Sequence, residues 1–309
     1  IDMEFYIYED DHIGGAFARL LARKARQGVL VRLLLDGFGS RHIGRSLCNS
    51  LRDSGVVVCI TSRMGSLRNH RKMAIIDGEI AYVGGVNIAD RYVTGNSLGV
   101  WHDVELRIEG VEVERLVKIF EYDLMLFHGI VGNIATETKG AIDIYCTELQ
   151  SSIVALFEDV VSSARRELIF TTPYLFPTRM MVDQLRLVVE RGVRVIIILP
   201  ERCDVWPLDD IMRSIYSDVI NVGVEIRLLR GAFVHSKMAL VDRRRVVLGS
   251  ANLDARSLHI NRELMLSTSQ ERVCHSAYTY IRSLLNNATP PLSEELRGRI
   301  PCLLYTSPS

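Results

Sequence analysis

The sequence predicts an α/β protein made of two similar halves, and three observations support this prediction. First, the pattern His-x-Lys-x-x-x-x-Asp occurs twice, and each copy is followed by a small-residue turn that ends in Asn. Second, every position of the second copy lies 165 residues after its counterpart in the first. Third, short apolar runs alternate with amphipathic segments that end at glycine, which is typical of βα units around a mostly parallel sheet.

The duplicated pattern supplies the candidate chemical groups. One such short pattern arises by chance, whereas two copies in register indicate an internal duplication. Two histidines, two lysines, two aspartates and two asparagines recur: His70, Lys72, Asp77 and Asn87, then His235, Lys237, Asp242 and Asn252.

Apolar spacing justifies each element of the first half in turn. Apolar residues recur at helical spacing over 13–25, where Asp10 or Asp11 can cap the helix and Gly28 can end it. The nearly continuous apolar run 29–35 predicts a strand that is covered on both faces. The remaining predicted elements are strands at 5–8, 56–60, 72–77, 80–83 and 103–108, a tight turn at Asp77-Gly78, and helices at 44–52 and 111–127.

The second half is predicted to repeat this order. Arg191-Gly192-Val193 corresponds to Gln27-Gly28-Val29, and the apolar strand 193–199 corresponds to 29–35. The other predicted elements are helices at 150–163, 179–191 and 208–221 and strands at 168–171 and 224–229, before the second motif.

The residue types of the motifs are suited to phosphodiester chemistry. In an extended segment, residues i and i+2 point to the same face, so each His-x-Lys pair presents an imidazole beside an ammonium. A neutral imidazole can attack phosphorus, a protonated one can donate to a leaving alcohol, and lysine ammoniums and asparagine amides can hold phosphate oxygens. Such a site needs no metal, but it requires the two imidazoles in opposite protonation states.

The two motifs resemble the paired HKD motifs of the phospholipase D superfamily. Flanking segments are similar to those of bacterial cardiolipin synthases, in the same order: 4–11, 32–40, 101–110, 171–177 and 231–237. The resemblance extends from the first residues to about Leu285. It implies two αβα-sandwich halves related by a pseudo-twofold axis, with His70 and His235 meeting in an active site at their interface and no cofactor.

The resemblance also implies roles for the motif residues. His70 is expected to be the nucleophile and His235 the general acid and later the base, although spacing alone leaves the reverse assignment open. Lys72 and Lys237 are expected to bind the non-bridging oxygens, and the two motif asparagines, Asn87 and Asn252, to complete the phosphate pocket.

Two pairs of carboxylates are candidates to support the histidines. Asp77 and Asp242 are included in the predicted catalytic set, although their position five residues beyond the lysine also suits residues that brace a turn. Asp103 and Glu263, which also match acidic positions of the family, can orient the imidazoles through Nδ1, as in a serine-hydrolase triad. The alternative for this second pair is that they are charges at strand ends.

Composition sets limits on the architecture and on partners. The 309 residues suggest two domains, which we place at 1–134 and 135–301 with a boundary in the segment 132–140. Lysine plus arginine and aspartate plus glutamate both number 37, so the neutral chain argues against a general nucleic-acid binder. Six scattered cysteines without a Cys-x-x-Cys pattern predict reduced thiols rather than a zinc site.

Both ends of the sequence carry expectations of their own. The chain begins with Ile1 inside a predicted strand, so it is expected to be a fragment of a longer protein; many cardiolipin synthases carry membrane helices before this point, and the sequence leaves open whether this protein does. Residues 302–309 resemble a translated sequencing adapter and are predicted to be a non-native tail.

These observations predict a phosphatidyltransferase that makes cardiolipin from phosphatidylglycerol through a phosphohistidine. The alternatives are phospholipase D-type hydrolysis or transfer to another alcohol, a nuclease of the same superfamily, and an inactive scaffold. The expected partners are phospholipids and the membrane surface, with the catalytic part on the cytoplasmic side of a bacterial cell membrane. Arg63, Arg68 and Arg71 are expected to form a basic rim, and Tyr174 and Phe176 to line a lipid entrance or to pack in the core.

Overall fold

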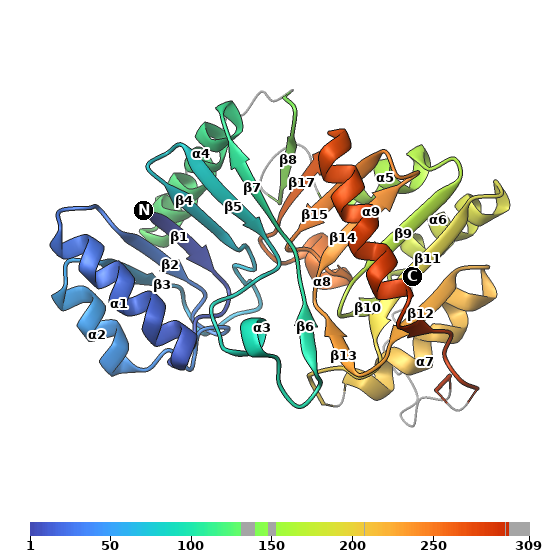
Figure 1. Ribbon diagram of the computed structural model, residues 1–309, viewed down its shortest axis with the longest axis horizontal. Helices are drawn as coiled ribbons and strands as arrows, with labels where there is room; N and C mark the ends of the chain where they lie inside the picture. Colours follow the sequence, from blue (N-terminus) through green and yellow to red (C-terminus); the bar gives the residue numbers. More distant parts are fainter. Residues whose placement is uncertain (131–139, 148–152, 207, 294, 297–309) are drawn as a thin grey trace.

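The computed structural model describes residues 1–130, 140–147, 153–206, 208–293 and 295–296. Each half has its own twisted sheet, and the two sheets lie side by side with helices around them (Figure 1). The predicted boundary between the halves at 134/135 and the tail at 302–309 lie outside the described residues.

The first sheet has the order β3-β2-β1-β4-β5-β7. Its first three strands run parallel and are joined by two helices: β1 (Asp2–Phe5), α1 (His12–Arg26), β2 (Arg32–Leu35), α2 (Arg45–Asp53) and β3 (Val57–Ile60). The Asp11 carboxylate accepts a hydrogen bond from Gly14 N, so Asp11 is the N-cap of α1. The half continues with β4 (Met73–Ile76), β5 (Ile80–Gly84), α3 (Arg91–Thr94), β6 (Val100–His102), β7 (Glu105–Glu109) and the long helix α4 (Val111–Phe127). Of these strands, β4, β5 and β7 join the sheet in antiparallel pairs, and β6 lies outside it.

The second sheet has the order β18-β12-β11-β9-β14-β15-β17-β8. Its elements up to the second motif are β8 (Asp143–Cys146), α5 (Ile153–Ser163), β9 (Glu167–Thr171), β10 (Leu175–Phe176), α6 (Arg179–Glu190), β11 (Arg194–Pro200), α7 (Leu208–Asn221), β12 (Glu225–Leu229) and β13 (Ala232–Val234). The motif and its continuation follow as β14 (Lys237–Val241), β15 (Arg245–Gly249), β16 (Leu253–Asp254), α8 (Ala255–His259), β17 (Leu264–Thr268), α9 (Glu271–Leu285) and β18 (Ala288–Thr289).

The order of strands confirms the duplication. The series β3-β2-β1-β4-β5-β7 of the first half corresponds, strand by strand, to β12-β11-β9-β14-β15-β17 of the second. The two motifs therefore enter their sheets at equivalent strands, β4 and β14, which lie antiparallel beside the equivalent strands β1 and β9.

The prediction of a mostly parallel sheet was wrong. Within the described strands of the two large sheets, only β1–β2–β3 and β9–β11–β12 pair in parallel, and the neighbours on the motif side are antiparallel. The reason is local: the Asp77-Gly78 turn, with φ values of 55° and 70°, reverses the chain directly from β4 into β5. Helices return the chain in parallel only where the connection is long enough to hold one.

Alternation along the central strands builds an αβα sandwich in each half. In β2, Leu33 and Leu35 face the core beneath α1 and α2, whereas Leu34 faces the core beneath α4. In β11, Ile197 faces the core beneath α5, α6 and α7, whereas Ile196 faces the side of α9.

The core that contains α4 and α9 is continuous across the two halves. It joins apolar residues of the first half, such as Val83 and Phe120, to residues of the second, such as Leu266 and Ile281. The halves also exchange backbone hydrogen bonds: β6 pairs in parallel with β13, and Arg262 bonds to both Arg68 and His70. These contacts fix the two motifs relative to each other.

None of the helices in the part of the chain described here is long and apolar enough to span a bilayer.

Candidate active site

Both His-x-Lys segments lie where a motif strand begins, at the interface of the halves. His70 and Lys72 immediately precede β4, and Lys237 is the first residue of β14. Each lysine folds back on its own histidine: Lys72 Nζ donates to His70 O, and Lys237 Nζ donates to His235 O at 2.5 Å. All four side chains are buried, and each pair forms one compact cationic unit.

Each histidine is held by a carboxylate from the other half. His70 Nδ1 lies 2.9 Å from Oε2 and 3.1 Å from Oε1 of Glu263, at the start of β17. His235 Nδ1 lies 2.5 Å from Oδ2 of Asp103, between β6 and β7. The sequence predicted both carboxylates as orienting groups, but it did not show that the pairing crosses the interface.

The charge of the two carboxylates fixes the histidine tautomers. Hydrogen bonds and attraction from His70 and Lys72 hold the Glu263 pKa at about 2 against desolvation, and His235 and Lys237 lower the pKa of Asp103. An ionised carboxylate can only accept a hydrogen bond, so Nδ1 of each imidazole carries the proton. The Nε2 lone pairs of the neutral rings are therefore the reactive positions.

The protein alone does not place the histidines in opposite protonation states, contrary to the prediction. Burial lowers the pKa of His70 despite Glu263, and burial with the nearby Lys237 ammonium lowers the pKa of His235 to about 3. Both imidazoles are therefore neutral in the empty site at neutral pH. A bound phosphodiester adds a negative charge, which favours the protonated form of an adjacent imidazole.

The two lysines are poised near neutrality by the same burial. Desolvation lowers the pKa of Lys72 to about 7 and that of Lys237 to about 8, even though Glu263 and Asp103 favour their charged forms. Lys237 Nζ also lies 3.0 Å from His235 Nε2. A phosphate anion between these ammoniums would supply the counter-charge that the protein provides only in part.

Asp77 and Asp242, which were predicted to be catalytic, do not lie in the site. They occupy the turns at the far ends of β4 and β14, about 16 Å along an extended chain from the motif lysines. Asp77 is exposed with φ 55°, and the Asp242 carboxylate accepts hydrogen bonds from the backbone N–H groups of 165, 166 and 167. Their assignment as catalytic residues was wrong, and bracing the strand ends is their role.

The two motif asparagines border the site in different ways. Asn87 Oδ1 accepts a hydrogen bond from Ile7 N, and its Nδ2 donates one to the Tyr92 hydroxyl, so Asn87 links the loop after β1 to α3. Asn252 is buried, and its Oδ1 has no hydrogen-bond partner among the described residues. Both side chains line the cleft described below.

Arg71 is not part of a basic rim, contrary to the prediction. Its side chain is fully buried, bonds to Glu263 O through Nε at 3.2 Å, and forms an ion pair with Asp123 of α4. Asp123 also pairs with Arg262, the neighbour of Glu263 in the other half. This buried triad, Arg71–Asp123–Arg262, fixes the residues that flank both His70 and its carboxylate. Of the other arginines predicted for the rim, Arg68 borders the cleft and Arg63 a separate hollow.

The motifs open into a cleft of about 880 Å³ between the halves. His70, His235, Lys237 and both motif asparagines line it, together with Tyr174 and Phe176; Phe176 also packs against the core of the second half, so both alternatives given for it apply. The parallel strands of both halves point their carboxyl ends at this region, which is where open α/β sheets bind ligands.

Several aromatic neighbours were missed in the sequence. The Tyr6 ring lies edge-on to His70 at 4.8 Å, while Tyr92 and Trp101 lie 5.1 and 5.3 Å from the His235 ring. Trp101 lies within the flanking segment 101–110, but no spacing pattern connects Tyr6 or Tyr92 with a histidine. These rings restrict the imidazoles and exclude water from their flanks.

Matching positions of the repeat explain why one carboxylate is Glu and the other Asp. Ser250, in the turn after β15, donates to Glu263 Oε2 at 2.5 Å. Its counterpart in the first half is Gly85, where an added Cβ would lie 2.2 Å from Asp103 Oδ1. The glycine therefore leaves room for the shorter carboxylate, and the serine supports the longer one.

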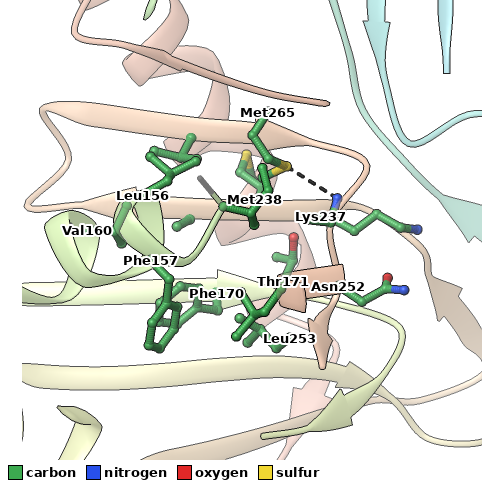
Figure 2. Close-up of a pocket in the computed structure, with 15 residues that line it drawn as sticks. Leu156, Phe157, Val160, Phe170, Thr171, Lys237, Met238, Asn252, Leu253 and Met265 are labelled. Carbon is green, nitrogen blue, oxygen red and sulfur yellow. Dashed lines mark hydrogen bonds between the residues drawn. The ribbon is translucent and has the colours of Figure 1, made fainter. Parts of the chain in front are cut away.

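An apolar pocket lies directly behind Lys237, between α5 and the second sheet (Figure 2). Leu156, Phe157 and Met238 line its interior, while Lys237 and Asn252 stand at one end with their polar groups pointing away from it. This apolar packing adjoins the Lys237 side chain, and burial lowers the pKa of Lys237.

The duplicated fold and the paired motifs place the protein in the phospholipase D class. The crystal structure of phosphatidylserine synthase from Haemophilus influenzae Rd KW20 superposes with a TM-score of 0.73 over 94% of this chain and 82% of that chain, at 14% identity. Polyphosphate kinase from Porphyromonas gingivalis gives a TM-score of 0.67 over 95% of this chain and 44% of that chain, also at 14% identity. At these identities the likeness concerns the fold alone.

Sequence comparison identifies the family. The profile described as "Cardiolipin synthase, PLD-like domain" matches residues 1–123 and 158–285, and the chain belongs to that family. Cardiolipin synthase 1 of Bacillus cereus is 30% identical over 302 residues, which cover 89% of this chain and 59% of that protein. Cardiolipin synthase of Geobacillus kaustophilus is 32% identical over 285 residues, which cover 85% of this chain and 57% of that protein. The chain thus spans about three fifths of the length of the curated relatives it matches.

The Arg71–Asp123–Arg262 triad generates a stability prediction. Asp123→Asn removes the carboxylate that two buried guanidiniums share, and breaking a buried ion pair by removing one partner costs about 3–5 kcal/mol. We expect urea denaturation of Asp123→Asn to show that the free energy of unfolding falls by that amount. Glu121→Gln is the control, because Glu121 forms a half-exposed pair with Arg32, and such pairs contribute about 0–1 kcal/mol. Equal effects of the two substitutions would contradict the structural role of the triad.

Proposed function

We propose that the chain catalyses phosphatidyl transfer between two phospholipids through a covalent phosphohistidine, with cardiolipin as the product. The observation that carries the proposal is the crossed arrangement of the site. One cleft is lined by two imidazoles and by the buried Lys237, and an ionised carboxylate holds Nδ1 of each imidazole. The other lysine, Lys72, folds back beneath His70. This arrangement suits a phosphodiester bound between the two histidines.

In the first step, the neutral Nε2 of His70 attacks phosphorus, and the bond from phosphorus to the glycerol oxygen breaks. His235, protonated in the presence of the anionic substrate, gives its Nε2 proton to the departing glycerol. Lys72 and Lys237 stabilise the charge that develops on the non-bridging oxygens. The aromatic rings beside both imidazoles hold them in this geometry.

In the second step, a hydroxyl of the acceptor lipid attacks the phosphorus from the face that glycerol has left. His235, now neutral, removes the hydroxyl proton, and the P–N bond to His70 breaks. His70 returns neutral and His235 returns protonated, so the cycle closes. The assignment of His70 as nucleophile follows the family resemblance, and the geometry is compatible with it because both oxygens of Glu263 lie near its Nδ1.

The substrates are proposed to be phosphatidylglycerol or a similar phospholipid, met at a bacterial cell membrane from its cytoplasmic side. The names of the curated relatives support cardiolipin synthesis, and they come from Bacillus and Geobacillus. A cleft of about 880 Å³ exceeds what a phosphate group requires and leaves room for glycerol-sized groups on both sides of phosphorus.

Product analysis tests the proposed function. With phosphatidylglycerol in mixed micelles, we expect cardiolipin and glycerol in equal amounts, and no turnover by His70→Asn. His275→Asn is the control, because His275 lies outside the cleft on α9. Phosphatidic acid without cardiolipin would establish a hydrolase instead, and cleavage of DNA in the presence of EDTA would establish a nuclease.

The carboxylates generate a second prediction. Glu263→Gln should lower kcat by about 10³- to 10⁴-fold, because the neutral amide no longer fixes the His70 tautomer or supports its positive form. Asp242→Asn should keep kcat within about threefold, since this carboxylate only caps backbone N–H groups at the strand end. Steady-state kinetics of both purified variants decide the matter. The reverse order of effects would restore Asp242 to the catalytic set.

The lysine pKa values generate a third prediction. Because Lys72 and Lys237 lose their charge near pH 7 and 8 in the free protein, kcat/KM should fall by about tenfold per pH unit between these values and by about a hundredfold per unit above them. Phosphate binding favours the ammonium forms, so kcat should fall at higher pH than kcat/KM does. A pH profile from 6 to 10 measures both. A kcat/KM that stays constant up to pH 9 would contradict the role of these ammoniums.

A further inference from the structure

Two loops at the mouth of the cleft expose large apolar side chains. In the first half, the loop 61–69 carries Met64, 85% exposed, and Leu67, 58% exposed. In the second half, the loop after β11 carries Val205 and Trp206, and the Trp206 side chain is 87% exposed. Each loop follows the carboxyl end of a parallel strand, and each has a residue, Arg68 or Val205, in the lining of the cleft. The two loops therefore flank the same opening.

Arginines surround these apolar groups. Arg41, Arg68 and Arg256 all line the cleft. The Arg41 and Arg68 guanidiniums stack on the half-exposed Phe38 ring at 5.3 and 4.5 Å from its centre. Arg256 Nη2 donates to Ser66 O at 2.6 Å, so a residue of the second half supports the apolar loop of the first. The cleft lining also holds the carboxylates of Glu9, Asp204 and Asp254, but four arginines and Lys237 outnumber them, so positive charge is in excess here although the whole chain is neutral.

This combination favours an anionic bilayer as the occupant. Aromatic and long aliphatic side chains enter the boundary between head groups and acyl chains, while arginines on the same surface attract anionic head groups. Arginine stems also cover apolar surface while their guanidiniums remain in the polar layer. A diacyl lipid whose phosphate reaches buried histidines must enter through this mouth, so the mouth has to face the membrane.

We infer that this mouth surface, defined as Phe38, Arg41, Met64, Leu67, Arg68, Val205, Trp206 and Arg256, docks directly on an anionic membrane. Met64, Leu67 and Trp206 insert below the head groups, and the arginines bind lipid phosphates. The inference rests on the proposed function, because that function is what requires a lipid to enter the cleft.

Vesicle co-sedimentation of the 309-residue chain tests the inference. We expect binding to phosphatidylglycerol vesicles that is at least tenfold tighter than to phosphatidylcholine vesicles and that weakens as salt is raised. The variant Met64→Ser/Leu67→Ser/Trp206→Ser should lose binding by about tenfold for each apolar group removed. The matched control is Leu30→Ser/Val111→Ser/Leu187→Ser, whose side chains are 61%, 65% and 57% exposed away from the mouth.

Two double variants test whether the arginines at the mouth, rather than positive charge elsewhere on the protein, attract the vesicles. Arg41→Gln/Arg68→Gln should weaken binding to phosphatidylglycerol vesicles by about tenfold, whereas Arg19→Gln/Arg23→Gln, on the exposed side of α1, should not. Trp206 gives an independent signal, since insertion shifts its emission to shorter wavelength. Trp101 is buried and serves as the unshifted internal reference.

Turnover of a short-chain phosphatidylglycerol below its micelle concentration distinguishes the two proposals. The triple variant Met64→Ser/Leu67→Ser/Trp206→Ser should transfer phosphatidyl groups from this dissolved lipid at the wild-type rate, but it should not transfer them from vesicles. The docking inference alone would be overturned if this triple variant bound vesicles as tightly as the wild type does. It would also be overturned if the wild type bound phosphatidylglycerol and phosphatidylcholine vesicles equally. Vesicle binding without turnover of any lipid would overturn the proposed function and leave the docking surface standing.

Discussion

The exchange of carboxylates between the two halves is the constraint on which the rest of the site depends. Glu263 holds His70, and Asp103 holds His235, so neither half contains a complete imidazole–carboxylate pair. The halves must therefore remain fixed to within a few tenths of an ångström. The continuous core around α4 and α9, the β6–β13 pairing and the Arg71–Asp123–Arg262 triad provide that rigidity.

The second constraint is electrostatic. Two buried ammoniums and two imidazoles face two ionised carboxylates, and apolar packing such as the pocket behind Lys237 raises the cost of every charge. In the absence of a ligand, the site responds by depressing the pKa of both lysines and both histidines. In the proposed function, a phosphodiester would supply the missing anion, so the substrate itself would bring the site into its reactive protonation state.

Sequence reasoning predicted the duplication, most helices and strands that precede the second motif, the two His-x-Lys pairs and the two carboxylates that contact the histidines, but it placed the first strand at 5–8 instead of Asp2–Phe5 and did not predict β8 or α9. The correct predictions succeeded because helical and alternating periodicity are local, and because two motif copies in register report a common geometry. The failures have a common physical cause, which is that long-range contacts leave no local pattern. The local sequence suggests that Arg71 is a surface charge, because its partner Asp123 lies 52 residues away in the chain. Asp77 and Asp242 share the motif with the catalytic residues, but a five-residue extended segment carries them to the opposite strand end.

The most direct test of the account is to trap the covalent intermediate. Phosphatidylglycerol labelled at phosphorus is mixed with the His235→Asn variant, and the protein is denatured in alkaline detergent, digested at alkaline pH and mapped by mass spectrometry. The account predicts one acid-labile phosphatidyl group per chain on His70, which forms slowly because the first step lacks its acid and is retained because the second step lacks its base. Label on a residue other than a motif histidine, or turnover at the wild-type rate without His235, would contradict two imidazoles acting on one phosphorus.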